Sequence, residues 1–568
     1  MPRRLAQSYK RHPVTEAYDA IVIGSGIGGL ACAALLAKHG GCKVLVLERH
    51  YTPGGYTHVF HRPNYDWDVG LHYLGGLEPG SPIRRVFDDI CIRPIEWADM
   101  GEVYDRVIID GDIYDLPKGR RNLRAMLLDR FPGQESAIDG YFATVHAAAS
   151  ASMPFQAAKT LPGPVAAVVG PVLQRRFRRW SDRTTREVLA ELTDDPRLIA
   201  VLTAQLGDYG LPPADSSFAM HAIVASHYFR GGYYPVGGSG VIAESIIPVI
   251  EQAGGTILIS AEVAEIVIED DRAVGVRMAA DDAVIRAPII ISDAGVATTF
   301  GRLVPHDVAQ RSGLLADLTR VGPSLAHLCL YLGFEQTAEE LDLPKHNLWI
   351  YPGDDVEGAF RASRADPQAP FPVLYVSFPS AKDPDFARRH PGRATVEIIA
   401  PAPYEWFEPW ADSRWKHRPE EYDEFKKTLA TRMLEGLYAQ LPQLRGQVAF
   451  QEISTPLSTA HFAGYERGEL YGLEHTPARF AEDFLKPTTP IRGLYLTGQD
   501  VVSCGVAGAM FGGVLTATTV LRGQALRGLA TTAIRRVPAG STLANSATST
   551  ARRVQQTLTG RHRQPRRG

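Results

Sequence analysis

The glycines close to the N-terminus have the spacing of a loop that binds phosphate groups. Gly24, Gly26 and Gly29 form a GxGxxG pattern that encloses Ile27 and Gly28. The first glycine permits a tight turn, the second lets the backbone approach a pyrophosphate, and the third lets a helix pack closely on a strand. The N–H groups at the start of that helix favour a bound phosphate. Such a pattern also arises by chance, so the flanking segments decide its meaning.

These segments predict a βαβ unit. Residues 18–24 form a short apolar run, which is typical of a buried parallel strand, and residues 30–39 predict an alanine-rich helix. Residues 43–48 predict a second strand and place Glu48 at its end, about 20 residues after the glycines. We therefore expect a dinucleotide, with the Glu48 carboxylate accepting hydrogen bonds from ribose hydroxyls.

Two features favour FAD over a nicotinamide dinucleotide as the cofactor. The first is a glycine pair, Gly54 and Gly55, that follows Glu48 and Arg49. This extension is similar to the flavoprotein form of the motif. The paired glycines would let the main chain run close to the pyrophosphate or the flavin.

The second feature lies near the C-terminus. Residues 494–497 predict a strand, and Gly498 and Asp500 follow it before a helix of small residues that contains Val506 and Ala507. We expect Asp500 to reach the ribityl or pyrophosphate region and the helix to direct its N-terminus at the flavin ring. No second glycine motif follows a strand. The redox partner therefore stays open between a quinone, oxygen, a separate reductase and a nicotinamide that visits the same face.

Size and composition narrow the class of protein. The chain has 568 residues, which exceeds the ~250–300 residues at which a single core stops growing. A net charge of -3 argues against nucleic acid as a partner, although no acidic residue follows Asp500 and ten arginines do. The five cysteines have no metal-binding spacing, so we expect no metal site. No signal peptide and no membrane-spanning run is predicted, which favours the cytoplasm.

The pattern along the chain predicts an α/β fold with a three-layer Rossmann-like FAD-binding domain and an inserted mixed α+β substrate domain. Helices are expected at 238–253 and 420–441, a single strand at 256–268, and a β-rich region from 320 to 405. The expected segments are a flexible leader 1–17, FAD-domain parts 18–85, 226–305 and 471–523, a mainly helical region 86–225, a substrate domain 306–470, and a disordered basic tail 524–568.

Further segments resemble a known family. Residues 68–75, 234–238, 292–295 and 468–472, together with the motifs above, are similar to the phytoene desaturase, carotenoid isomerase and retinol saturase group of flavoproteins. The resemblance implies FAD-dependent desaturation, saturation or isomerisation of carbon–carbon double bonds in a hydrophobic, isoprenoid polyene. It also implies that Val263 meets the adenine through its backbone.

Candidate catalytic residues come from the segment that resembles the family. His72 and Tyr73 could face the flavin, or they could form a hydrogen-bonded core pair, with Asp68 anchoring the loop. A histidine or tyrosine acts as an acid or base only when its pKa is suitable. Weaker candidates are Tyr233, Tyr234, His461, Tyr465 and Tyr471.

A peripheral membrane contact is predicted from one apolar segment. Residues 161–173 are apolar, and four arginines and Trp180 follow among residues 175–180. This composition suits a helix in the headgroup layer, and the alternative is a buried helix with a cationic end.

Two other functions stay open: an amine-oxidase or protoporphyrinogen-oxidase-like flavoenzyme, and a binder of prenylated proteins such as Rab GDP-dissociation inhibitors. The complete set of glycines with Glu48 and Asp500 argues against the binder.

Overall fold

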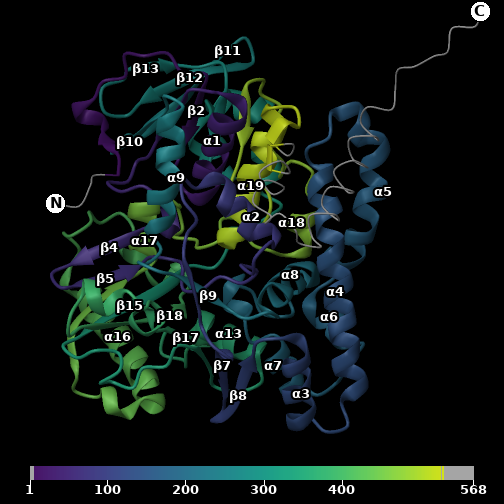
Figure 1. The fold of residues 1–568 in the computed structure, drawn as a ribbon, viewed down its shortest axis with the longest axis vertical. Helices are drawn as coiled ribbons and strands as arrows, with labels where there is room; N and C mark the ends of the chain where they lie inside the picture. The colour runs from purple at the N-terminus through teal and green to yellow at the C-terminus, as the bar shows by residue number, and fades with distance from the viewer. Residues whose placement is uncertain (1–4, 526–527, 530–568) are drawn as a thin grey trace, which may run out of the picture.

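The computed structural model describes residues 5–525 and 528–529, which form two units built on separate sheets. Figure 1 shows the unit with the parallel sheet in the upper part of the view and the unit with the mixed sheet below it. A pair of long helices flanks both units on one side. We call the two parts the parallel-sheet unit and the mixed-sheet unit.

The parallel-sheet unit joins segments from the beginning, middle and end of the chain. Its strand order is β1-β10-β3-β2-β14-β20, and every neighbouring pair is parallel. This arrangement confirms the predicted Rossmann-like fold. The strands are β1 (Gln7–Ser8), β2 (Ala20–Ile23), β3 (Val44–Leu47), β10 (Thr256–Ile259), β14 (Ile290–Ser292) and β20 (Leu494–Leu496).

This sheet is the middle of three layers, because its apolar strands bury both faces. Val22 and Val46 pack against the helices on one face, whereas Ile23 and Leu47 pack against a small antiparallel sheet on the other. The alternation follows from the two-residue period of a strand. The helices are α1 (Ile27–Gly40), α9 (Val241–Gln252) and α19 (Gly505–Val520), and the small sheet has β11 (Val263–Glu269), β12 (Arg272–Met278) and β13 (Val284–Arg286).

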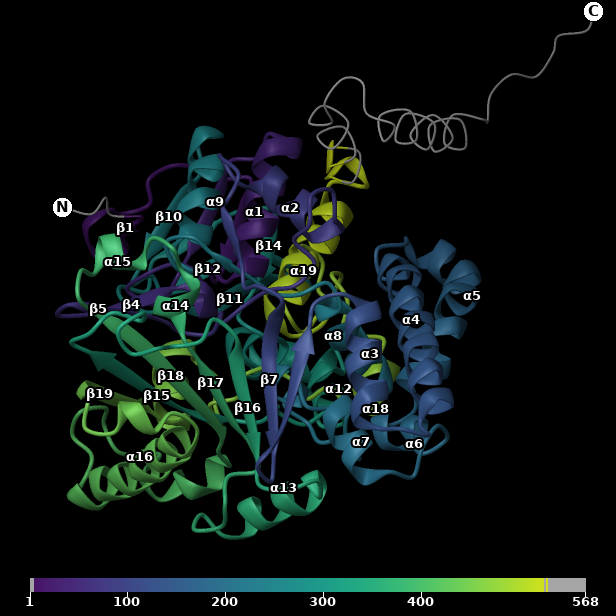
Figure 2. The same cartoon turned by 60° about the horizontal axis from the view of Figure 1, so that its bottom comes forward.

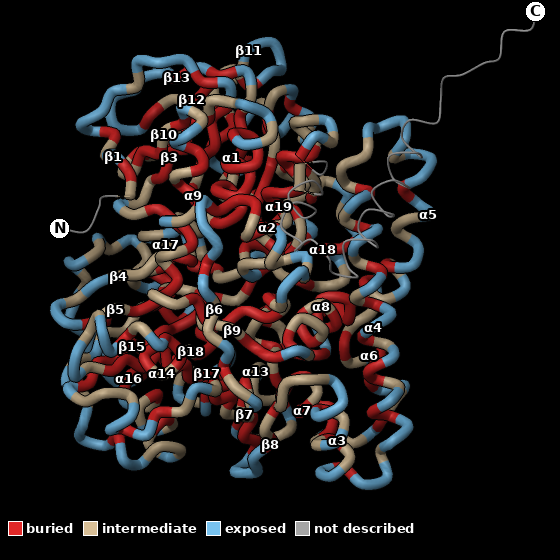
Figure 3. The backbone as a smooth tube through the Cα atoms, viewed as in Figure 1, coloured by how far each residue is buried: buried red, intermediate tan, exposed pale blue. Residues whose placement is uncertain are grey.

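The mixed-sheet unit has a seven-stranded sheet in the order β19-β15-β18-β17-β16-β7-β8. Leu429, Met433 and Leu437 of α16 (Glu420–Gln440) share a core with one face, and Trp349 and Tyr375 share a core with helices on the other. Buried backbone fills the centre of both units (Figure 3). The strands are β7 (Val103–Ile109), β8 (Asp112–Pro117), β15 (His327–Phe334), β16 (Asn347–Tyr351), β17 (Leu374–Ser377), β18 (Ala394–Pro401) and β19 (Val448–Ser454).

A helical region lies beside this sheet. Its long helices α4 (Glu135–Ala158) and α5 (Gly163–Ser181) pack side by side at the edge of the molecule, as Figures 1 and 2 show. Shorter helices connect them to the sheet. These are α3 (Arg120–Arg130), α6 (Thr185–Leu189), α7 (Pro196–Leu202) and α8 (Phe218–Tyr228).

The apolar half of α5 is exposed, so the alternative of a fully buried helix is wrong. Val168 and Val172 have exposed fractions of 76% and 72%, and Val165 and Val169 are also exposed. Only the C-terminal half is held in the core, through Phe177. Within residues 5–525 and 528–529, no helix has the length and apolar character that a membrane span requires.

The expectation of a flexible leader over residues 1–17 is wrong where the structure describes it. Gln7 and Ser8 pair with Leu258 and Ile259 as the edge strand of the parallel sheet. Tyr9 is buried, and its hydroxyl donates to Asp281 over 3.0 Å. Main-chain hydrogen bonds to β10 order this polar segment. The prediction missed the strand because it relied on the pattern of apolar side chains, which does not report main-chain pairing. Most of the predicted tail 524–568 lies outside the described residues.

Two predictions of secondary structure also need correction. The region 86–225 is expected to be mainly helical, and most of its residues lie in helices, but the prediction omits the strands β6 (Trp97–Asp99), β7 and β8. β7 pairs with β16, which follows more than two hundred residues later, so its partner cannot be read locally. The single strand expected at 256–268 is divided at Ser260, whose φ of 50° turns the chain from one sheet to another.

Candidate functional site

A cavity of about 1150 Å³ lies at the carboxyl ends of the parallel strands. The residues that follow β2, β3, β14 and β20 line it on one side, and β15 and β19 of the mixed-sheet unit line it on the other. Ligands of α/β proteins bind outside the carboxyl ends of the strands. The volume reaches the upper end of the ~300–1,000 Å³ that is typical of ligand and cofactor clefts.

The glycine loop leaves no room for side chains. A Cβ atom on Gly28 would lie 2.5 Å from the Cα atom of Gly498, and one on Gly29 would lie 2.5 Å from the carbonyl oxygen of Gly24. Gly24 itself has a φ of 98°, which favours glycine. The start of α1 at Gly28 therefore packs directly against the backbone of Gly498, which follows β20. The loop presents bare backbone to the cavity, as binding of a pyrophosphate requires.

The carboxylate of Glu48 closes this loop. Its Oε2 accepts hydrogen bonds from the backbone N–H of Ser25 over 2.9 Å and from the Ser25 hydroxyl over 2.6 Å. Its Oε1 accepts from the N–H of His50 over 2.7 Å. Glu48 lines the cavity while its oxygens keep further lone pairs for a ribose. The sequence analysis missed Ser25, which no motif position singles out.

Most of the predicted dinucleotide contacts line the cavity, and three lie outside its lining. A Cβ atom on Gly55 would lie 2.9 Å from the Cα atom of Gly26, so the glycine pair rests directly on the glycine loop. Asp500 accepts from the N–H groups of Val296 over 2.8 Å and Leu473 over 3.1 Å. The predicted residues that line the cavity are Gly24, Gly26, Ile27, Gly28, Glu48, Arg49, Gly54, Gly55, Val263, Asp500 and Val506. Those outside its lining are Gly29, Gly498 and Ala507.

His72 and Tyr73 lie outside the cavity lining, in a buried polar network. The Tyr73 hydroxyl contacts the carboxylates of Asp105 over 3.0 Å and Asp208 over 3.1 Å. Nδ1 of His72 lies 2.8 Å from Oε2 of Glu397. The Tyr73 side chain is thus hydrogen-bonded in the core, whereas Nδ1 of His72 lies close to Glu397 without a hydrogen-bond partner among the described residues.

Lys382 connects the two halves of this network. Its ammonium group donates to the carbonyl oxygen of His72 and to the Ser377 hydroxyl, each over 2.8 Å, and also to Asn347. Asn347 in turn donates to Asp105 over 2.8 Å. Burial lowers the pKa of Lys382 to about 7 and raises the pKa of Asp105 to about 7. Burial also raises the pKa of Glu397 to about 8.

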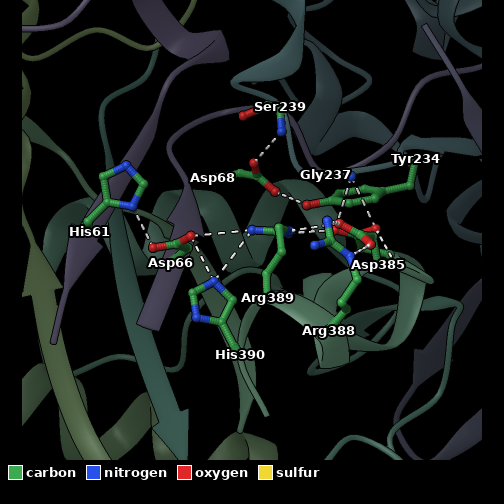
Figure 4. A network of polar contacts seen from close by, with 11 residues as sticks. His61, Asp66, Asp68, Tyr234, Gly237, Ser239, Asp385, Arg388, Arg389 and His390 are labelled. Carbon is green, nitrogen blue, oxygen red and sulfur yellow. Dashed lines mark hydrogen bonds and ion pairs between the residues drawn. The ribbon is translucent and has the colours of Figure 1, made fainter. Parts of the chain in front are cut away.

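A second polar cluster ties the hairpin of β4 (Val59–Arg62) and β5 (Tyr65–Asp68) to its surroundings. Asp68 accepts from the N–H of Ser239 over 2.8 Å and from the hydroxyl of Tyr234, as Figure 4 shows. Arg389 bridges Asp66 and a loop of the mixed-sheet unit in the same view. Asp68 therefore anchors the segment that leads into the cavity wall.

Aromatic side chains form a further part of the cavity wall. The rings of Tyr56 and Tyr465 are nearly parallel at 8°, with centroids 6.5 Å apart. The Tyr471 hydroxyl donates to the carbonyl oxygen of Gly207 over 2.7 Å. His327 also lines the cavity, and burial lowers its pKa to about 4. Of the weaker candidates, His461, Tyr465 and Tyr471 line the cavity, and Tyr233 and Tyr234 do not.

The sequence analysis missed several of these wall residues. Tyr331 and His327 belong to β15, and no local pattern marks a strand residue as facing a ligand. Tyr56 follows Gly55 directly, and this position next to the glycine pair could have indicated that Tyr56 lines the cofactor cavity. The aromatic wall is suited to contact with a flat, apolar, conjugated ligand.

Comparison with known proteins agrees with this architecture. Residues 22–90 match the model of the NAD(P)-binding Rossmann-like domain. The structure of a putrescine oxidase bound to putrescine superposes with a TM-score of 0.57 at 15% identity, covering 89% of this chain and 99% of that one. At that identity the likeness concerns the fold alone.

Sequence relatives extend over nearly the whole chain. All-trans-retinol 13,14-reductase of Danio rerio is 36% identical, covering 91% of this chain and 88% of its own length. The chloroplastic prolycopene isomerase of Arabidopsis thaliana is 26% identical, covering 90% of this chain and 84% of its own length. The chain therefore belongs to the retinol saturase and carotenoid isomerase-like family of oxidoreductases.

Proposed function

We propose that the protein is an FAD-dependent oxidoreductase that acts on carbon–carbon double bonds of a retinoid- or carotenoid-like polyene. One observation carries the proposal: a glycine loop that can receive a pyrophosphate and an aromatic wall share one cavity. Relatives at 33–36% identity are reductases by name, which favours saturation over isomerisation. Desaturation would be the reverse transfer.

The cofactor would be held along the edge of the parallel sheet. The N–H groups at the start of α1 would receive the pyrophosphate, Glu48 the ribose, and the main chain at Val263 the adenine. Gly54, Gly55 and Asp500 would border the ribityl chain. When bound, FAD supplies a hydride acceptor or, in its reduced form, a hydride donor.

The chain's own contribution is to position the polyene and exclude water. The rings of Tyr56 and Tyr465 would hold the conjugated chain flat, and the wall strands β15 and β19 would cover it. Burial and the nearby charge of Asp500 raise the pKa of Tyr465 well above its ordinary value. Tyr465 thus stays protonated and offers a neutral surface to an apolar substrate.

The proposal includes delivery of the substrate from a membrane surface. Exposed Val168 and Val172 lie on α5, the helix whose C-terminal half carries arginines and Trp180. Apolar side chains beside cationic and aromatic ones suit the headgroup layer of a bilayer with anionic lipids. A polyene dissolves in the bilayer and not in water, so such a contact would supply it to the enzyme.

Anaerobic spectroscopy tests the function. FAD-loaded protein is mixed with liposomes that carry all-trans-retinol or a lycopene isomer, once with oxidised and once with reduced flavin. Reoxidation of the flavin with a shortened chromophore identifies saturation, and bleaching with a lengthened chromophore identifies desaturation. New isomers without a net flavin change identify isomerisation. If neither flavin state changes any polyene, the substrate class is wrong, and amines and porphyrinogens become the next substrates to test.

A further inference from the structure

Asp293 occupies an unexpected place for an acidic side chain. It follows β14, the strand that lies between β2 and the edge strand β20 in the parallel sheet, and it lines the cavity. Its carboxylate lies against the glycine loop: a Cβ atom on Gly26 would be 2.6 Å from Oδ2, and one on Gly28 would be 2.7 Å from Oδ1.

The same carboxylate lies close to Gly26 and Gly29, whose backbone N–H groups lower its pKa. These N–H groups stand at the start of α1, a helix of 14 residues, and they are the donors that a dinucleotide phosphate would use. A negative side chain thus lies close to the donors that the cofactor needs. Two anions cannot share one small set of donors without strong repulsion.

The titratable groups near Asp293 do not stabilise a negative charge on its carboxyl group. The carboxylates of Glu48, which follows β3, and Asp500, which follows β20, are close enough for their charges to raise its pKa. Cys32 of α1 and Tyr465 of the cavity wall are its other titratable neighbours, and both are neutral near pH 7 because burial raises their pKa. Burial and the two carboxylates raise the pKa of Asp293 to about 8, against the opposing effect of the glycine N–H groups.

We propose that Asp293 gates the phosphate site, so that its carboxyl group must take up a proton before the dinucleotide binds. The inference rests on the proposed FAD site and adds a residue that competes with the cofactor. If the bound form requires a neutral carboxyl group, the affinity for FAD is constant below the pKa of Asp293. Above it, the dissociation constant rises by about tenfold per pH unit.

Fluorescence titration of the apoprotein with FAD tests the gate independently of turnover. Dissociation constants are measured from pH 6.5 to pH 9.5 at constant ionic strength for wild type, Asp293→Asn and Asp307→Asn. Asp307 is an exposed carboxylate paired with Arg311 and lies outside the cavity lining, so its variant controls for a general loss of negative charge. Proton uptake on binding is measured in parallel with a pH indicator in weak buffer.

The gate predicts a rising dissociation constant above about pH 8 in wild type and in Asp307→Asn, with close to one proton taken up per FAD at pH 9. Asp293→Asn keeps an oxygen acceptor for the glycine N–H groups and should show a flat profile without proton uptake. If Asp293→Asn keeps the slope of the wild type, or if the wild type has none, the gate is overturned while the cofactor site stands. If no variant binds FAD at any pH, the cofactor site and the gate fail together.

Discussion

Nδ1 of His72 lies 2.8 Å from Oε2 of Glu397, inside the protein and away from the cavity lining. Glu397 is fully buried on β18, and Lys382 is the cation of the same network. A buried ion network of this kind is expensive to desolvate, so its groups depend on one another. The network joins the segment that enters the cavity wall to the mixed sheet, and its integrity should control the stability of the whole interface.

Replacement of Lys382 by methionine should therefore destabilise the protein. The variant removes the donor to His72, Ser377 and Asn347 while it keeps most of the side-chain volume. Loss of one partner from a buried ionic network typically costs ~3–5 kcal/mol. Urea unfolding measures the change, and Lys345→Met, at an exposed position, serves as the control. A loss no larger than that of the control would show that the network contributes little stability.

Asp105 should make the stability depend on pH. Burial raises its pKa from 3.8 to about 7. Between these values the folded state holds a proton that the unfolded state has lost, so this group's contribution to stability is full below pH 3.8 and declines as pH rises to about 7. Asp105→Asn removes this decline. The free energy of unfolding of the variant, relative to wild type, should therefore rise from pH 5 to pH 7, by at most ~1.4 kcal/mol per unit.

Denaturant unfolding of both proteins at pH 5, 6, 7 and 8 provides the measurement. The control is Asp112→Asn, because Asp112 is exposed at the start of β8. Parallel stability curves for wild type and Asp105→Asn would mean that Asp105 is ionised in the folded protein throughout this range.

Local signals predicted the parallel-sheet unit well. β2 and β3 are short apolar runs around a glycine turn, and Glu48 stands at the expected distance. In such a unit the hydrophobic pattern, the turn residues and the residues that bind the cofactor lie close together in the sequence. The fold of this unit could be predicted for that reason, and most of the predicted dinucleotide contacts line its cavity.

The remaining features depend on partners that are distant in the sequence. Tyr73 meets Asp208, and the polar character of either residue alone does not reveal the contact. Asp293 is followed by Ala294 and Gly295 and looks like an ordinary turn residue, although its carboxylate lies against the glycine loop. The edge strand β1 is fixed by main-chain hydrogen bonds, which no side-chain pattern encodes.

Gly28 should tolerate no side chain. A Cβ atom there would lie 2.5 Å from the Cα atom of Gly498, so relief requires the backbone of α1 or the loop after β20 to move. We expect Gly28→Ala to lose ~1–3 kcal/mol of stability and to bind FAD at least tenfold more weakly. Fluorescence titration and urea unfolding measure both effects. Gly301→Ala is the matched control, because a Cβ atom at Gly301 meets nothing within 4 Å. Equal affinities would contradict the proposed close approach of the pyrophosphate.

The exposed valines of α5 should determine membrane binding. Val168→Glu with Val172→Glu places two charges on the surface that we propose enters the headgroup layer, so sedimentation with liposomes should fall at least tenfold. Anionic liposomes should bind the wild type better than neutral ones, and added salt should reduce the difference because the arginines of α5 are screened.

Val284→Glu, at a position that is 41% exposed on β13, tests whether any exposed valine has this effect. Turnover of a water-dispersed polyene should remain unchanged in the α5 variant, since the cavity lies elsewhere. Undiminished liposome binding by the double variant would remove α5 as the membrane contact and leave the proposed chemistry intact.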